Sequence, residues 1–273
     1  MISQTLIGAG LALALALPLA GKWRLGVARS AATVVVLAIA SSLTVALVDN
    51  FLFSLSVSTR SAGVAALALA LGCGLLAQRF YRDPERTPPD EDNVVVSPAD
   101  GEVVYVRHAR DGVLPVVTKR GREYQLVELT KTPLSYADAV VIGIGLSFLD
   151  VHVNRSPIGG KVVLQRRYPG PFGSLRRPEM VFENQRATMV IERDDLQVGV
   201  VMIASRLVRR IVTYVKEGDI VGGGQRIGMI RFGSQVDLVL PVKDDLQVPV
   251  RPGDRVKAGE TIVAVFARVP AHA

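Results

Sequence analysis

Apolar residues are concentrated in the first third of the chain. Three stretches, residues 1–21, 30–48 and 61–78, contain no charged side chain. Each has about the length that an α-helix needs to cross the hydrocarbon core of a bilayer, roughly 17–25 residues. A signal peptide is the alternative for the first stretch, but Met1–Gln4 lacks the positive charge typical of one. The pattern predicts two to three transmembrane helices within residues 1–79.

Basic residues next to these stretches predict their orientation. Lys22, Arg24 and Arg29 lie between the first and second stretches, and Arg79 and Arg82 follow the third. Positively charged loops stay in the cytoplasm, so we expect a cell-membrane protein whose remaining chain lies on the cytoplasmic side. The second and third stretches are also compatible with a re-entrant pair, which leaves the number of spans open.

Residues 80–93 separate this apolar part from a chain of different pattern. They are charged and contain Pro84, Pro88 and Pro89, which disfavour a continuous helix, so we interpret them as a linker and domain boundary. Residues 94–273 contain short runs of alternating apolar and polar residues between Gly, Pro and Asp-Gly turn signals, a pattern that predicts a β-rich domain. The expected strands are Val94–Ser97, Glu102–Arg107, Val113–Val117, Tyr124–Leu129, Lys161–Arg167, Ala187–Glu192, Val198–Ala204 and the run from Gln235 onward. Helix is expected only around Ser147–Asn154 and Arg206–Val208.

The net charge of +7 is divided between the two parts. Residues 1–79 hold five Lys or Arg and one Asp, whereas the remainder holds 27 basic and 24 acidic residues. A net charge of +3 on that remainder is too small to indicate a nucleic-acid partner, and attraction to an anionic lipid surface is the better inference. The single cysteine, Cys73, excludes a disulfide framework and a thiolate metal site.

The last 60 residues contain an internal repeat. Val215–Ile227 returns as Val250–Ile262 at an offset of 35, with six identical positions that include a Gly-Asp turn. Two copies of such a unit indicate two similar halves packed face to face. The repeat resembles the half-repeats of lipoyl and biotinyl carrier domains. The expected fold is therefore mainly β, a lipoyl-like β-sandwich (barrel-sandwich hybrid) with few short helices, preceded by the transmembrane helices.

A Gly-Ser bond between these repeats carries the candidate chemistry. Gly233 and Ser234 directly precede the strand that starts at Gln235, so the Ser234 hydroxyl can attack the Gly233 carbonyl and move the acyl group from nitrogen to oxygen. Elimination of the resulting ester and hydrolysis of the dehydroalanine would leave a pyruvoyl group. Gly173-Ser174 is an internal control, because it lies in a proline-rich loop with no strand after it. Most Gly-Ser pairs only turn the chain.

Four motifs in this order give a more specific indication. They are Ser97-Pro-Ala-Asp-Gly101, Phe148-Leu-Asp-Val-His-Val-Asn-Arg-Ser-Pro157, Glu183-Asn-Gln-Arg186 and Phe232-Gly-Ser234. Together they resemble phosphatidylserine decarboxylase in its shorter form, over about residues 80–273. The resemblance implies a precursor that cuts itself into a large chain, residues 1–233, and a small chain, residues 234–273.

The resemblance also implies the site and the reaction. Asp100, His152 and Ser234 would form the processing triad, and Ser234 would become a covalent pyruvoyl cofactor, with no metal and no pyridoxal phosphate. That carbonyl would form a Schiff base with the substrate amine, and loss of carbon dioxide would convert phosphatidylserine to phosphatidylethanolamine. The implied partners are a phospholipid substrate in the membrane and the two chains of one precursor; homo-oligomer formation stays open.

The residue types support these roles. A serine needs a base, and of three histidines His108 and His272 lie in surface contexts, whereas His152 has apolar neighbours. Asp150 competes with Asp100 as the carboxylate partner, and the resemblance favours Asp100. Longer family members have a His-x-x-His pattern where this chain has Arg155 at the second position. This difference leaves open whether His152 acts in cleavage, in decarboxylation or in both.

Arg155 and the overall function each have an alternative interpretation. Arg155 stays charged and cannot act as a base, so it either binds a substrate carboxylate or phosphate or pairs with a structural acid. The alternative function is a membrane-anchored, lipoyl-like adaptor without catalysis. An adaptor of that kind leaves the Asp100, His152 and Ser234 motifs unexplained.

Overall fold

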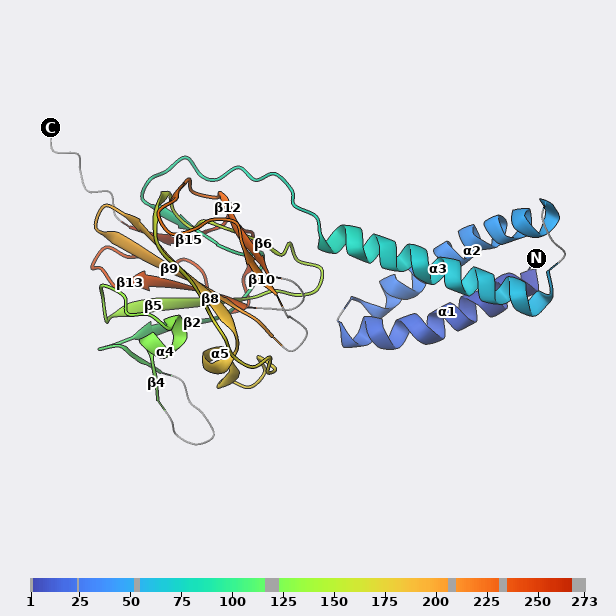
Figure 1. The fold of residues 1–273 in the computed structure, drawn as a ribbon, viewed down its shortest axis with the longest axis horizontal. Helices are drawn as coiled ribbons and strands as arrows, with labels where there is room; N and C mark the ends of the chain where they lie inside the picture. The colour runs from blue at the N-terminus through green and yellow to red at the C-terminus, as the bar shows by residue number, and fades with distance from the viewer. Residues whose placement is uncertain are drawn as a thin grey trace. The chain divides into compact units, whose positions relative to one another are not determined.

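A computed structural model describes residues 2–23, 25–51, 55–115, 123–205, 210–230 and 235–266. The chain divides into two compact units, Met1–Arg82 and Asp83–Ala273 (Figure 1). Each unit has its own buried core, and they are described separately.

The first unit consists of three apolar helices, α1 (Ile2–Lys22), α2 (Val27–Phe51) and α3 (Val57–Phe80). Small residues let these helices pack closely; a side chain on Gly8, for example, would collide with Val64. Most of their Leu, Ile and Val side chains nevertheless face outward. All three are long and apolar enough to cross a membrane, as the uncharged stretches predicted. An ion pair of 2.9 Å between Arg60 and Asp49 links α3 to α2.

The second unit is built around one curled, eight-stranded antiparallel sheet. Its strands, in spatial order, are β11 (Ile220–Val221), β7 (Gly160–Tyr168), β8 (Arg186–Arg193), β9 (Leu196–Ile203), β13 (Gln235–Pro241), β5 (Ala139–Gly145), β2 (Gly101–Ala109) and β14 (Arg255–Val256). Smaller sheets pair β10 (Ile211–Thr213), β12 (Arg226–Ile230) and β6 (Val153–Arg155), then β1 (Val94–Val96) with β15 (Ile262–Val265), and β3 (Val113–Leu114) with β4 (Tyr124–Gln125).

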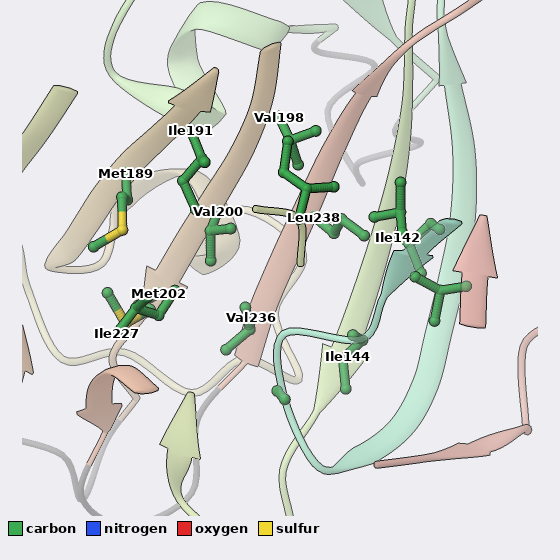
Figure 2. Packing of buried hydrophobic residues seen from close by; sticks show 14 of the residues in the cluster. Ile142, Ile144, Met189, Ile191, Val198, Val200, Met202, Ile227, Val236 and Leu238 are labelled. Atoms are coloured by element: carbon green, nitrogen blue, oxygen red, sulfur yellow. The ribbon is translucent and has the colours of Figure 1, made fainter. Parts of the chain in front are cut away.

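Apolar side chains cover both faces of the large sheet. On one face Ile142, Met202 and Leu238 belong to the main core, whose side chains interdigitate across neighbouring strands (Figure 2). The other face packs against α4 (Leu126–Thr130) and α5 (Met180–Glu183), where the Tyr124 and Phe182 rings stack with centroids 3.9 Å apart. The central strand β13 is therefore buried along its whole length.

The predicted Gly-Asp repeat is present, but its copies occupy the two ends of one sheet. Gly218 donates its backbone N–H to the Val162 carbonyl over 2.8 Å, and Gly253 donates in the same way to Val103. These bonds place β11 beside β7 and β14 beside β2 as matching edges. A mainly β domain with few short helices is confirmed; a lipoyl-like sandwich is not.

Two local predictions were wrong. Tyr124–Leu129 was expected to be a strand, but only Tyr124–Gln125 is extended, and α4 follows with a capping box between Gln125 and Glu128. Ser147–Asn154 was expected to be helical, yet a turn leads there directly into β6. The second expected helix, at Arg206–Val208, lies outside the described residues.

Candidate active site

The described strands that precede and follow the Gly-Ser pair belong to two sheets, β12 to the three-stranded sheet and β13 to the eight-stranded sheet. Gly233 and Ser234 themselves lie outside the described residues. Four residues before Ser234, the backbone N–H of Ile230 donates to the carbonyl of His152 over 3.1 Å. Directly after Ser234, Gln235 starts β13 and pairs with both β5 and β9. The chain therefore reaches Ser234 from a strand bonded to the His152 backbone and continues after it into the centre of the large sheet.

The His152 ring is buried and oriented by a neighbouring backbone carbonyl. The side chain is completely buried, and Nδ1 lies 2.8 Å from the main-chain oxygen of Asp150. A carbonyl oxygen only accepts hydrogen bonds, so the neutral ring carries its proton on Nδ1 and its lone pair on Nε2. An imidazole fixed in this tautomer can take a proton from a hydroxyl at Nε2.

The rival carboxylate, Asp150, is committed elsewhere. It orients the His152 ring through its backbone carbonyl, whereas its side chain accepts a hydrogen bond of 2.7 Å from the Ser147 N–H and forms an ion pair with Arg255. Its carboxylate therefore stabilises the loop that precedes β6.

Asp100 lies in the turn between β1 and β2, and its motif packs beside the His152 motif. The Pro98 carbonyl accepts hydrogen bonds from the Arg155 N–H at 2.9 Å and from Asn154 Nδ2 at 3.4 Å. Asp100 is buried, and its carboxylate accepts a hydrogen bond of 2.7 Å from the Ala258 N–H. It also pairs with Arg86. The fold thus brings two motifs that are distant in sequence to the same place.

Arg155 makes contacts that favour pairing with a structural acid over binding of substrate. Its guanidinium donates to the Gly224 carbonyl at 2.9 Å, to the Pro84 carbonyl at 2.9 Å and to the Asp83 carboxylate at 3.2 Å. The residue is 4% exposed. These partners come from a β-turn and from the linker. Binding of substrate by Arg155 stays a prediction, and it would require exchange of these partners.

Glu183–Arg186 shapes the loop that holds the control serine. Asn184 Oδ1 accepts from the Gly173 N–H at 2.7 Å, and its Nδ2 donates to the Gly173 and Ala204 carbonyls. Ser174 lies in a turn closed by the Arg177 N–H, and α5 comes next instead of a strand. Ser174 therefore precedes a helix and Ser234 precedes a strand, a difference that the sequence indicated.

A buried polar cluster next to the serine was missed by the sequence analysis. Tyr105 donates to Asp237 Oδ2 over 2.6 Å, and Gln235 Nε2 lies 2.6 Å from Asp237 Oδ1 and 2.7 Å from the Tyr105 hydroxyl. Room for the Tyr105 ring comes from Gly143 on β5, where a Cβ atom would lie 2.5 Å from it. An aspartate in an otherwise apolar central strand was the signal that could have revealed the cluster.

Burial dominates the electrostatics of this cluster. It raises the pKa of Asp237 to about 6, although hydrogen bonds from Tyr105 and Gln235 and the nearby guanidinium groups act in the opposite direction. Burial also lowers the pKa of Arg186 to about 10, partly offset by Asp237 and Tyr105. Buried groups with such shifts are frequent at functional sites. Gln235, the residue joined to Ser234, is thus hydrogen-bonded to a carboxyl whose pKa is raised by burial.

Comparison with known proteins agrees with this geometry. The sequence profile of the family described as phosphatidylserine decarboxylase matches residues 74–264. A putative archaetidylserine decarboxylase proenzyme from Methanothermobacter thermautotrophicus is 42% identical over 188 residues, which are 69% of this chain and 79% of the relative. A phosphatidylserine decarboxylase proenzyme from Erythrobacter litoralis is 40% identical over 196 residues, 71% and 74% of the two chains. A proenzyme of the same name from Geotalea uraniireducens is 37% identical over 188 residues, 68% and 78%.

The family match and these relatives define the class as a decarboxylase made as a proenzyme. The chain belongs to the phosphatidylserine decarboxylase family. This membership favours the enzyme over the non-catalytic adaptor.

Proposed function

We propose that this protein is a self-processing, pyruvoyl-dependent decarboxylase that converts phosphatidylserine to phosphatidylethanolamine in the membrane. The observation that carries the proposal is the buried His152 ring, whose tautomer is fixed by the Asp150 carbonyl and whose own carbonyl binds the strand leading to Ser234. Family membership supplies the reaction class.

Processing would use His152 Nε2 to remove the hydroxyl proton of Ser234. The Ser234 oxygen attacks the Gly233 carbonyl, and the amide nitrogen leaves with a proton, giving an ester. Elimination releases the Gly233 carboxylate and leaves dehydroalanine at residue 234. Water then replaces the nitrogen, with release of ammonia and formation of the pyruvoyl group. Asp100 would assist by stabilising the positive charge of the protonated imidazole, whose orientation is set by the Asp150 carbonyl.

The residues around Ser234 suit a pyruvoyl group. Gln235, which would carry it, is 5% exposed and hydrogen-bonded to Tyr105 and Asp237, so its position is fixed. The pyruvoyl carbonyl supplies an electrophile that condenses with the substrate amine and accepts electrons as carbon dioxide leaves. His152 lies in a buried site and can return a proton to the substrate Cα.

The substrate class follows from the membrane anchor and the relatives. A diacyl lipid stays in the bilayer, and the three apolar helices α1, α2 and α3 would hold the enzyme at that surface. Both phosphatidylserine and archaetidylserine decarboxylase proenzymes are similar to this chain, so the shared headgroup, phosphoserine, is the recognised chemistry. We place the catalytic domain on the cytoplasmic side from the positive-inside rule.

Mass spectrometry of the purified protein tests the proposal. Two chains are expected, the smaller starting at residue 234 without a free amine. Ser234→Ala should abolish cleavage and activity, whereas Ser174→Ala, the matched control in the other Gly-Ser pair, should retain both. A folded, uncut chain of 29.3 kDa would contradict self-processing.

A further inference from the structure

The linker after α3 packs onto the candidate active site. Asp83 accepts ion-pair contacts from Arg155 and Arg226, and Glu85 pairs with Arg226 over 2.8 Å. Pro88 packs against Gly224 so closely that a side chain at Gly224 would collide with its ring. Asp83, Glu85 and Pro88 of the linker therefore each contact a specific residue of the β domain.

Arg86 is the linker residue that reaches Asp100. Its Nη2 lies 2.9 Å and 3.2 Å from the two carboxylate oxygens of Asp100, and its Nη1 lies 3.0 Å from Glu260. The Arg86 side chain is 9% exposed and that of Asp100 is 12% exposed. The ion pair is therefore largely shielded from water, which strengthens it. Because one guanidinium nitrogen contacts both carboxylate oxygens, the orientation of the Asp100 carboxylate is restricted.

The Ala258 N–H completes this arrangement. It binds Asp100 Oδ1 from the second Gly-Asp repeat, so the carboxylate is held between the linker and the C-terminal part of the chain. A buried carboxylate that loses a charged partner is left poorly compensated and reorients toward other donors. The Arg86 contact thus determines how Asp100 is presented to its neighbours.

We infer that Arg86 is a positioning residue for Asp100, and that self-cleavage requires the linker to be seated with Arg86 on this carboxylate. The inference rests on the proposed function. It adds a residue from the linker between the membrane helices and the sheet, 148 positions before Ser234 in sequence, to the apparatus of processing. A mispositioned catalytic partner commonly slows a reaction by about tenfold to a hundredfold.

The test is a time course of self-cleavage of the full-length chain, synthesised into phospholipid nanodiscs and followed on denaturing gels. Arg86→Gln should slow cleavage about tenfold or more, and Arg86→Lys, which keeps the charge but not the fork, should restore part of the rate. Arg226→Gln is the matched control, because it removes linker ion pairs with Asp83 and Glu85 but leaves Asp100 untouched. It should stay within about threefold of the parent rate.

The outcomes separate this inference from the proposed function. Equal slowing in Arg86→Gln and Arg226→Gln would overturn it in favour of general linker attachment. Parent-like cleavage in Arg86→Gln or in Asp100→Asn would also overturn it, while loss of cleavage in Ser234→Ala would leave the proposed function standing. If Ser234→Ala is still cut before residue 234, the proposed function itself fails.

A folding defect is handled by a second comparison. Thermal unfolding of each variant in the Ser234→Ala background reports whether the uncleaved chain folds. If Arg86→Gln does not fold, the test is the self-cleavage rate of Arg86→Lys divided by that of Arg226→Lys. A ratio below about one third supports the positioning role, and equal rates contradict it. External guanidinium should accelerate cleavage of Arg86→Ala and leave Arg226→Ala unchanged.

Discussion

Asp237 should make the stability of the folded chain depend on pH in an unusual direction. Its carboxyl is fully buried, and burial raises its pKa from 3.8 to about 6. A carboxyl with a raised pKa binds its proton more tightly in the folded state than in the unfolded state. The folded chain is therefore favoured by this group at low pH, and that advantage is lost as the pH rises from about 4 to about 7.

The size of the effect follows from the shift. About two pKa units at 1.36 kcal/mol each correspond to about 3 kcal/mol of unfolding free energy. Asp237→Asn removes the titration while keeping the size of the side chain and an acceptor for Gln235. The parent should lose about 3 kcal/mol relative to this variant between about pH 4 and about pH 7.

The assay is thermal and urea unfolding of both chains in the same detergent over this pH range, each in the uncleavable Ser234→Ala background. Other groups titrate in both proteins, so the difference between the two curves isolates Asp237. Parallel curves across the whole range would refute the reasoning, because they would mean that Asp237 has the same proton affinity in the folded and unfolded states.

Three other substitutions test the site. His152→Gln should slow processing, turnover of the cleaved enzyme, or both by about 10²–10⁴-fold, measured by gel and by release of carbon dioxide; normal rates in both assays would remove His152 from the site. Gly143→Ala should lower the free energy of unfolding by about 1–3 kcal/mol, because its Cβ atom would displace the Tyr105 ring; an unchanged melting temperature would argue against this packing. Arg155→Lys should lower the free energy of unfolding, because it loses contacts to Asp83 and Pro84 of the linker, and it should leave KM unchanged. A raised KM at unchanged stability would instead favour a role in substrate binding.

The parts of the fold visible in the sequence are those set by local pattern. Long uncharged stretches revealed the three apolar helices. The repeated Gly-Asp turns revealed two similar units, but the expected face-to-face packing was wrong, because the two copies form opposite edges of one sheet. Strand β5 was missed because Ala139–Gly145 is buried almost throughout, so no polar alternation marks it. Leu126–Thr130 was misjudged because its apolar side chains also suit a strand, and the capping contact of Glu128 decides for helix.

In the candidate site, too, only the features set by local sequence could be predicted. His152 could be chosen from its apolar neighbours and its motif, since both are local. The partners of Arg155 could not, because Asp83 lies 72 positions earlier in the chain and only the folded linker brings it there. The cluster of Tyr105, Gln235 and Asp237 likewise joins strands more than 100 positions apart. Long-range polar pairing of this kind leaves little trace in a single sequence.

The central position of β13 has a consequence for how the protein folds and unfolds. This strand has a partner on each side and lies on the C-terminal side of the proposed cut, together with β14 and β15. The chain would therefore fold as one molecule but unfold as two. Before cleavage, recovery from denaturation is an intramolecular event; afterwards it requires a 40-residue fragment to find the middle of a sheet, at a rate that depends on concentration. Each molecule would thus have one opportunity to assemble, and its lifetime would be set by how slowly the cleaved sheet opens.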